Sequence, residues 1–257
     1  ETWCKDRAIH NAILGGIQII DGKDKEHTPE YLPEMLSEAL SVSFDQKVGH
    51  DYLLESKERF DYYNRKEERL ELDLDFFNKI TRGGIPSKTL NICLAGTGVG
   101  KTMFMTHLAS SVLLQGKNVL YITMEMAEER IAERVDANLL NVGMSDLEEL
   151  PYKMYETKIN KLQKKTTGQL IVKEYPTASA SVAHFKNLLS ELAMKKSFKP
   201  DIVFIDYLNI CASSRFKAGA NVNSYTYIKA IAEELRGLAV EQDIPIFSAT
   251  QTTRSGF

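Results

Sequence analysis

The sequence predicts an α/β fold with a mainly parallel sheet, because short apolar runs alternate with helical stretches from about residue 72 onward. Each run has the length and continuous apolar character of a strand that is buried on both faces. The predicted strands cover residues 89–95, 118–124, 169–175, 201–207 and 244–250. The helical stretches between them cover residues 102–116, 127–140, 182–196 and 224–242. Right-handed crossovers through these helices would make the strands parallel.

Residues 1–70 precede this pattern and are polar and helix-prone. The charged segment 55–71 indicates a solvated linker or helix. Nearer the start, four isoleucines at steps of four, four and three residues predict one apolar stripe on a helix. They are Ile9, Ile13, Ile17 and Ile20. Gly15 and Gly16 would weaken this helix by roughly 1 kcal/mol each relative to alanine, so we expect it to be docked against another surface.

Composition limits the class of protein. At 257 residues and 43% apolar content, the chain can bury one sizeable core, which favours a single α/β domain with an appendage. A net charge of -3 argues against a generally basic nucleic-acid coat but allows a local basic track. The cysteines Cys4, Cys93 and Cys211 are far apart, so neither a disulfide framework nor a zinc site is indicated. A reducing, cytoplasmic setting is expected.

The ends and the apolar runs add two expectations. No run approaches the roughly 18 apolar residues that cross a bilayer, and no signal-peptide pattern is present, so no membrane partner is expected. The chain begins without a methionine and stops just after a predicted strand. We therefore expect it to be a fragment of a longer protein.

A glycine-rich turn follows the first predicted strand. Its sequence, AGTGVGKT, fits the P-loop pattern, in which glycines let backbone amides point at a phosphate. In that pattern Lys101 would reach the β and γ phosphates and Thr102 would hold Mg²⁺. Alanine replaces the usual first glycine, which costs little at an ordinary φ. A glycine-rich turn without a ligand is the alternative, but the strand before it and the helix after it favour a site for ATP or GTP. The expected contacts are Ala95, Gly96, Thr97, Gly98, Val99, Gly100, Lys101, Thr102 and Met103.

Two carboxylates follow other predicted strands. Asp206 comes after four apolar residues and is placed to hold Mg²⁺, with a strand or turn cap as the alternative. Many P-loop enzymes carry a glutamate next, but Tyr207 occupies that position here, so the catalytic base must come from elsewhere. Glu125 is the best candidate, because the carboxyl ends of parallel strands converge on the ligand crevice. Its alternative is a first-turn glutamate favoured by a helix dipole.

Four stretches in this order resemble the motif series of the DnaB-type hexameric replicative helicases, whose motor is a RecA-like ATPase domain: AGTGVGKT, YITMEMAEERIAER, DIVFIDYLNI and IPIFSATQTTR. The sequence around these motifs is most similar to that of the T-even bacteriophage members of the family, which work with a primase. The resemblance covers about residues 70–257. It implies a linker region over residues 1–70, preceded by a collar domain. It also implies a RecA-like ATPase domain over residues 71–257, truncated at its carboxyl end.

The resemblance also implies roles for individual residues. It makes Glu125 the catalytic base and Arg134 the arginine of the same motif, at the nucleotide. It makes Gln251 the glutamine that senses the γ phosphate and couples it to DNA-contacting loops. The motif around Gln251 differs from the family's common Ser-Gln-Leu-Asn-Arg: its sequence here is TQTTR. The family's arginine finger lies beyond Gln251 in order, past the end of this chain.

A polar segment after Asp206, residues 211–227, contains Arg215 and Lys217. Loops in this part of the resembling family face a central channel and touch single-stranded DNA. Two cations among hydroxyls and amides suit sequence-independent phosphate contact, and sixfold repetition would make a basic track despite the acidic total. A mobile surface loop is the alternative.

The resemblance implies an ATP-dependent helicase that forms a hexameric ring and moves 5′ to 3′ on single-stranded DNA to unwind the fork. The implied partners are forked DNA, other copies of the chain, a primase and a helicase loader, in a bacterial host's cytoplasm if a phage encodes the chain. A RecA-type recombinase or recombination-mediating DNA-dependent ATPase is the alternative. A small-molecule kinase would need a lid and acceptor pocket that the sequence does not indicate.

The resemblance bears on the isoleucine stripe as well. The isoleucine stripe could pack against the chain's own ATPase domain. The resemblance instead implies docking on the neighbouring subunit, reached through the charged segment, which would place each nucleotide at a subunit boundary.

Overall fold

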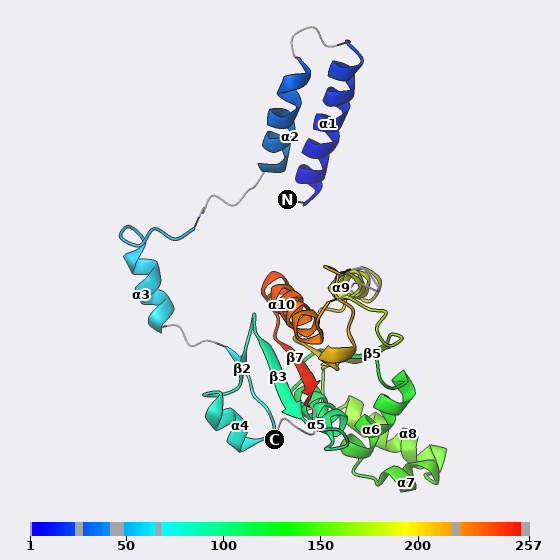
Figure 1. Cartoon of the computed structure of the whole chain (residues 1–257). Helices are drawn as coiled ribbons and strands as arrows, with labels where there is room; N and C mark the ends of the chain where they lie inside the picture. The colour runs from blue at the N-terminus through cyan, green and yellow to red at the C-terminus, as the bar shows by residue number, and fades with distance from the viewer. Residues whose placement is uncertain (1, 24–27, 42–48, 65–67, 217–221, 253–257) are drawn as a thin grey trace. The chain divides into compact units, whose positions relative to one another are not determined.

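The computed structural model describes residues 2–23, 28–41, 49–64, 68–216 and 222–252 of the chain (Figure 1). The chain divides into two compact units, Glu1–Lys66 and Glu67–Phe257. None of the described helices is both long and apolar enough to cross a membrane.

The described part of the first unit is helical. It contains α1 (Thr2–Ile20), the 3₁₀ helix η1 (Pro29–Tyr31), α2 (Leu32–Ser41) and α3 (Ser56–Asn64). Helices α1 and α2 lie side by side as a hairpin (Figure 1). Helix α3 buries none of its described residues, as its charged sequence predicts.

Small residues of α1 make the contact with α2. The buried positions of α1 are Ala12, Gly16 and Ile19. A Cβ atom at Gly16 would lie 3.0 Å from Leu32 Cδ2, and one at Gly15 would lie 3.4 Å from Met35 Sδ. The two glycines, which we expected only to weaken the helix, therefore also let α2 approach it closely.

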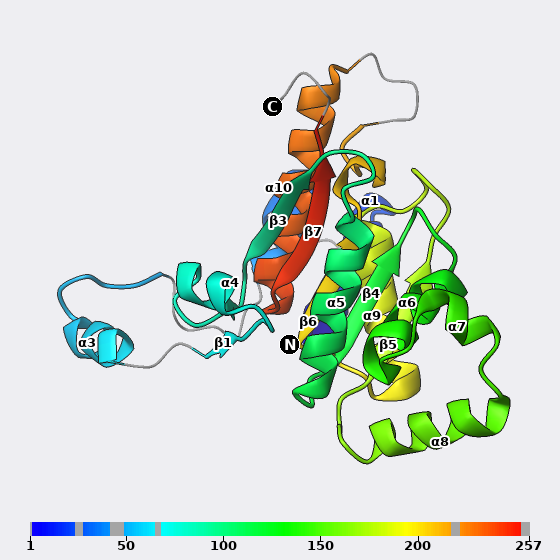
Figure 2. The same ribbon diagram turned by 90° about the horizontal axis from the view of Figure 1, so that it is seen from below.

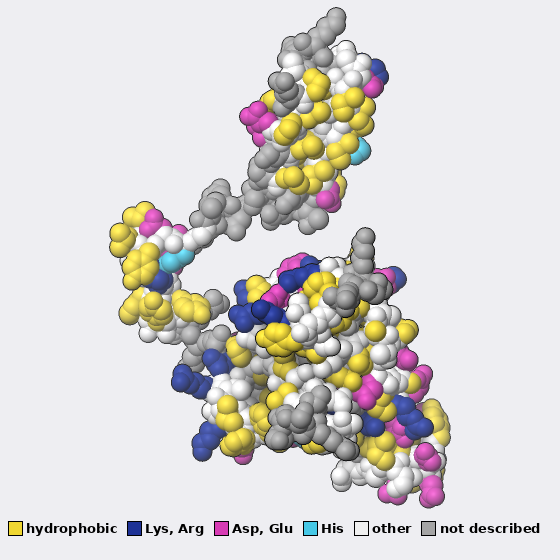
Figure 3. Space-filling model, viewed as in Figure 1, with side chains coloured by type: hydrophobic (Ala, Val, Ile, Leu, Met, Phe, Trp, Pro, Cys, Tyr) yellow, Lys and Arg dark blue, Asp and Glu magenta, His cyan; other side chains and the backbone are white. Residues whose placement is uncertain are grey.

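The isoleucine stripe lies mostly on a different face of α1. Ile13, Ile17 and Ile20 are 50%, 49% and 68% exposed, while Ile9 is half-buried. Figure 3 shows apolar side chains gathered over α1 and α2. Exposed apolar residues of the hairpin include Ile13, Leu14, Ile17, Leu36 and Leu40. Helix formation is thus as expected, but α2 does not cover the stripe.

Within the described residues, the second unit is built on a five-stranded parallel sheet in the order β3-β7-β6-β4-β5. The strands are β3 (Leu90–Ala95), β4 (Val119–Thr123), β5 (Leu170–Glu174), β6 (Ile202–Asp206) and β7 (Ile246–Gln251). Each lies within two residues of a predicted strand, so the α/β fold with a parallel sheet is confirmed.

Helices cover both faces of this sheet. The helices that follow β3 in the chain are α5 (Lys101–Leu114), α6 (Glu128–Leu140), α7 (Met144–Glu148), α8 (Tyr152–Gln163), α9 (Val182–Lys196) and α10 (Ser224–Gln242). Helices α9 and α10 pack on one face and α5 and α6 on the other (Figure 1). Successive residues of a strand point to opposite faces. In β4, accordingly, Leu120 and Ile122 join the first core, whereas Val119 and Tyr121 join the second.

A small antiparallel pair precedes the main sheet. Strand β1 (Arg69–Leu70) pairs with β2 (Ile85–Pro86), and α4 (Asp75–Ile80) lies between them in sequence. These elements are not predicted from the sequence, because each is too short to show a periodic pattern.

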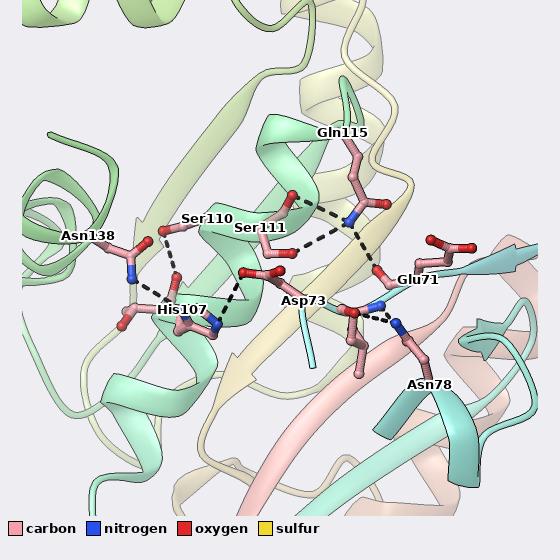
Figure 4. A network of polar contacts seen from close by, with 10 residues as sticks. Glu71, Asp73, Asn78, His107, Ser110, Ser111, Gln115 and Asn138 are labelled. Atoms are coloured by element: carbon pink, nitrogen blue, oxygen red, sulfur yellow. Dashed lines mark hydrogen bonds and ion pairs between the residues drawn. The ribbon is translucent and has the colours of Figure 1, made fainter. Parts of the chain in front are cut away.

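Polar contacts fasten α5 to its surroundings (Figure 4). His107 Nε2 lies 3.7 Å from Asp73 Oδ2, and Nδ2 of Asn138 lies 3.1 Å from His107 Nδ1. Near the end of α5, Gln115 donates a 3.0 Å hydrogen bond to the backbone oxygen of Glu71. The helix that follows the P-loop is therefore held both by α6 and by the segment before α4.

Candidate nucleotide-binding site

The P-loop sequence forms the turn between β3 and α5 (Figure 2). Gly98 and Gly100 have φ angles of +74° and +102°, which side chains with a Cβ rarely adopt. Helix α5 begins at Lys101 without a side-chain cap, so its first amides are available to an anion. Of the remaining predicted contacts, Val99 and Met103 have exposures of 72% and 51%. The turn therefore has the geometry of a phosphate cradle.

Asp206 ends β6 and is fully buried. Its Oδ2 accepts a 3.0 Å hydrogen bond from the Tyr121 hydroxyl, while Oδ1 has no partner among the described residues. Burial raises the pKa of Asp206, and the Thr102 and Tyr121 hydroxyls and the charges of Lys101 and Arg134 oppose that rise. A buried carboxylate oxygen without a partner is costly unless something binds it. Mg²⁺ prefers such oxygen ligands, so Asp206 and Thr102 fit the ion.

Tyr207, the residue after Asp206, lies beside the P-loop lysine. Lys101 Nζ lies 4.8 Å from the centre of the Tyr207 ring. Burial raises the pKa of Tyr207, and the nearby carboxylates of Glu125 and Asp206 add to that rise. Glu125 itself is exposed, two residues beyond the end of β4 at Thr123. Lys101 therefore lies over the ring of the residue that follows Asp206, and Glu125 follows β4, the strand that pairs with β6.

Arg134 lies on α6 beside the same buried group. Burial raises the pKa of both Asp206 and Tyr121, and the charge of Arg134 opposes that rise. Its Nη1 donates to the sulfur of Met126, and its Nε is buried without a hydrogen-bond partner in the described part of the chain. The structure thus places Arg134 near the candidate metal ligand.

Gln251 ends β7 and pairs with Ala95 across the sheet. Its side-chain amide donates to the Thr97 hydroxyl in the P-loop. Its backbone amide lies 3.4 Å from Asn209 Oδ1, which also accepts a 2.7 Å hydrogen bond from the Thr250 hydroxyl. Asn209 belongs to the 3₁₀ helix η2 (Leu208–Ile210), so polar contacts connect the P-loop with the segment after Asp206.

A model of the DnaB-like helicase C-terminal domain matches residues 70–256. The chain belongs to this family. The predicted resemblance and the expected α/β class are thereby confirmed.

Individual DnaB-like proteins are similar over different shares of the chain. A DnaB-like replicative helicase of Enterobacteria phage T4 is 41% identical over 268 residues, which cover 100% of this chain and 56% of that protein. The replicative DNA helicase DnaB of Helicobacter pylori (strain ATCC 700392 / 26695) is 29% identical over 174 residues, covering 67% of this chain and 34% of that protein. The chain thus spans about half of the first relative and a third of the second.

Two solved structures share the fold of this DnaB-like chain. One is a DnaB-like replicative helicase described together with its interactions with primase. It has a TM-score of 0.62 at 17% identity and covers 98% of this chain and 59% of that one. The other is described as an ATPase domain. It also has a TM-score of 0.62 at 17% identity, over 77% of this chain and 69% of that one.

The predicted DNA-contacting segment of this DnaB-like chain is described only in part. Lys217 lies outside the described residues. Arg215 is about half exposed, and its Nη1 lies 2.5 Å from Glu233 Oε2 on α10. Glu234 receives hydrogen bonds from the Ser213 hydroxyl at 2.5 Å and from the Ser214 backbone at 3.0 Å. The predicted cation is therefore already paired with a carboxylate.

Four residues that shape these sites in the DnaB-like domain were not predicted from the sequence. They are Tyr121, Asn209, Glu233 and Glu234. From the sequence alone, Tyr121 is expected to be a buried strand residue, and the two glutamates are expected to be charges on a helix surface. Only Asn209 carried a signal, as a polar side chain three residues after the predicted metal ligand.

Proposed function

We propose that the chain is the motor of a replicative DNA helicase that hydrolyses ATP or GTP. The observation that supports it is the position of Lys101, Glu125 and Asp206 at the carboxyl edge of the sheet, where Lys101 follows the turn after β3, Glu125 follows β4 and Asp206 ends β6. Ligands of open α/β sheets bind at that edge.

The proposed chemistry assigns one task to each side chain. The P-loop amides and Lys101 hold the β and γ phosphates, and Thr102 and Asp206 hold Mg²⁺. The ion would neutralise charge that develops on the phosphates. Glu125, exposed beside the Tyr207 ring, takes a proton from the attacking water. The charge of Arg134 would favour the ionised form of the buried Asp206, against the effect of burial.

The proposed coupling to DNA passes through the end of β7. Gln251 touches the P-loop through Thr97 and η2 through Asn209. A change at the γ phosphate would move Gln251 and, through η2, the segment that carries Arg215 and Lys217. These two cations would contact the phosphates of single-stranded DNA without reading bases.

The proposed assembly is a hexameric ring that moves 5′ to 3′ and unwinds the fork ahead of a primase, after loading by a helicase loader. Residues 1–70 would act as the linker region, with residues 71–257 as the ATPase domain. The exposed face with Ile13, Ile17 and Ile20 supports an intersubunit contact, since apolar patches of this kind commonly mark interfaces. The site of action would be the cytoplasm of a bacterial host.

Two measurements on the intact protein test the proposal. ATP turnover should rise when single-stranded DNA is added, and a forked duplex should be unwound when its single-stranded tail has a free 5′ end. DNA-stimulated turnover without unwinding would favour the recombination-type ATPase. Turnover that DNA leaves unchanged would exclude both DNA-dependent functions.

A further inference from the structure

A buried tyrosine reaches the candidate metal ligand from the neighbouring strand. Tyr121 lies in β4, which pairs with β6, and its hydroxyl donates to Asp206 Oδ2 at 3.0 Å. Neither residue is exposed to solvent. The tyrosine hydroxyl is the donor and the carboxylate oxygen the acceptor of this hydrogen bond.

The aromatic ring that carries this hydroxyl is held in place. It stacks on Phe204 with ring centres 5.9 Å apart and an interplanar angle of 15°. The ring of Phe204 in turn packs against that of Phe247, with ring centres 5.7 Å apart. Close packing of this kind leaves a buried ring little freedom to move. The hydroxyl therefore points at Asp206 from a defined position.

The two oxygens of Asp206 have different surroundings. Tyr121 occupies Oδ2, whereas Oδ1 has no hydrogen-bond partner within the described part of the chain although it is buried. A carboxylate held by one oxygen cannot rotate freely, so the other oxygen is presented in one direction.

We propose that Tyr121 is a positioning residue that holds Asp206 Oδ2 and thereby presents Oδ1 to the metal ion of the bound nucleotide. The inference rests on the proposed function, because it takes Asp206 as a metal residue. Groups that hydrogen-bond to a metal ligand orient it, and their loss commonly weakens metal affinity about 10- to 100-fold.

The test compares two tyrosine hydroxyls that each donate to an aspartate at 3.0 Å. Tyr121→Phe removes the one at Asp206, and Tyr155→Phe removes the one between α8 and Asp136 on α6, outside the proposed site. Binding of a fluorescent ATP analogue to the intact protein is measured in EDTA and then across a Mg²⁺ titration. Tyr121→Phe should bind normally in EDTA but need about tenfold more Mg²⁺ for half-maximal tightening. Tyr155→Phe should behave as wild type in both.

Asp206→Asn separates failure of this inference from failure of the proposed site. It should raise the Mg²⁺ requirement, and adding Tyr121→Phe should raise it no further, because the two residues act on one ion. A normal Mg²⁺ requirement in Tyr121→Phe, with a raised one in Asp206→Asn, would overturn the role of Tyr121 alone. A normal requirement in Asp206→Asn would overturn both. Equal losses of affinity in EDTA and in Mg²⁺ would make Tyr121 merely structural.

A measurement that keeps the tyrosine hydroxyl covers the case in which Tyr121→Phe does not fold. 3-Fluorotyrosine is placed at position 121 alone, and its ¹⁹F resonance is followed in the nucleotide complex. We expect the resonance to shift when Mg²⁺ is added to the complex and to stay in place when nucleotide is added in EDTA. A ¹⁹F resonance that does not shift when Mg²⁺ is added to the nucleotide complex would overturn the proposal.

Discussion

The side-chain amide of Gln251 donates a hydrogen bond to the hydroxyl of Thr97, so the end of β7 is tied to the P-loop. The same residue reaches Asn209 in η2 through its backbone. Strand β7 lies beside β3, which positions Gln251 against the start of the nucleotide site. This arrangement gives a changed phosphate a short physical route to the segment after Asp206.

Loss of Gln251 should uncouple DNA from ATP turnover. Gln251→Ala removes the contact with Thr97, so we expect nucleotide binding to stay near normal while DNA-stimulated turnover falls about tenfold or more. Turnover with and without single-stranded DNA is the measurement, and the exposed Gln163→Ala on α8 is the control. A variant that DNA still stimulates fully would contradict the role of Gln251.

Lys101 and Glu125 should affect different steps. Lys101→Ala removes a charge from the β and γ phosphates and should weaken ATP binding as well as turnover. Glu125→Gln keeps shape and hydrogen bonding but loses basicity. ATP should therefore still bind while hydrolysis falls about 100-fold or more. Equilibrium binding and steady-state turnover on each variant separate the two effects.

The matched control for Glu125→Gln is Glu129→Gln, another exposed glutamate at the start of α6. It should leave turnover unchanged. Near-normal hydrolysis in purified Glu125→Gln would refute the assignment of the base.

The Arg215 side chain should bind DNA more tightly when its carboxylate partner is removed. Glu233→Gln frees Arg215, and an exposed ion pair of this kind contributes up to about 1 kcal/mol, so single-strand affinity should rise about two- to fivefold. Glu241→Gln on the same helix breaks the Lys186 pair instead and serves as the control. Binding of a fluorescent oligonucleotide measures both.

The two predicted cations should also set the salt dependence of DNA binding. Arg215→Ala with Lys217→Ala should lower single-strand affinity and flatten its dependence on salt, because fewer counterions are released. Turnover without DNA should change far less. An unchanged salt slope would mean that this segment is a surface loop.

The exposed stripe on α1 should be needed for ring assembly. Ile13→Asp with Ile17→Asp spares the Gly16 contact with α2, so the hairpin should remain folded. We expect a nucleotide-binding monomer that has lost DNA-stimulated turnover. Sedimentation measures its assembly, and Asn11→Asp with Gln18→Asp adds the same charge at exposed polar positions as the control. Rings with normal turnover would exclude the swapped docking.

Strands and helices of the sheet domain were predictable because local patterns determine them. The continuous apolar run that ends at Asp206 predicted β6, and the fully buried strand confirms it. The P-loop was predictable too, since Gly98 and Gly100 adopt the positive φ that their pattern requires. The packing of α1 against α2 was not predicted. The spacing of the isoleucines is a stronger signal in the sequence than the two glycines, Gly15 and Gly16, that lie against α2.

The sequence by itself determined the α/β class, the family and the residue types that meet a phosphate. Spacing and polarity along the chain carry that information. Only the tertiary structure decided that Tyr121 meets Asp206, that Gln251 meets Thr97 and that Glu233 pairs with Arg215. These partners lie 18 or more residues apart in the chain, up to 154 between Gln251 and Thr97. Strand order and helix packing bring them together, and no local pattern encodes either.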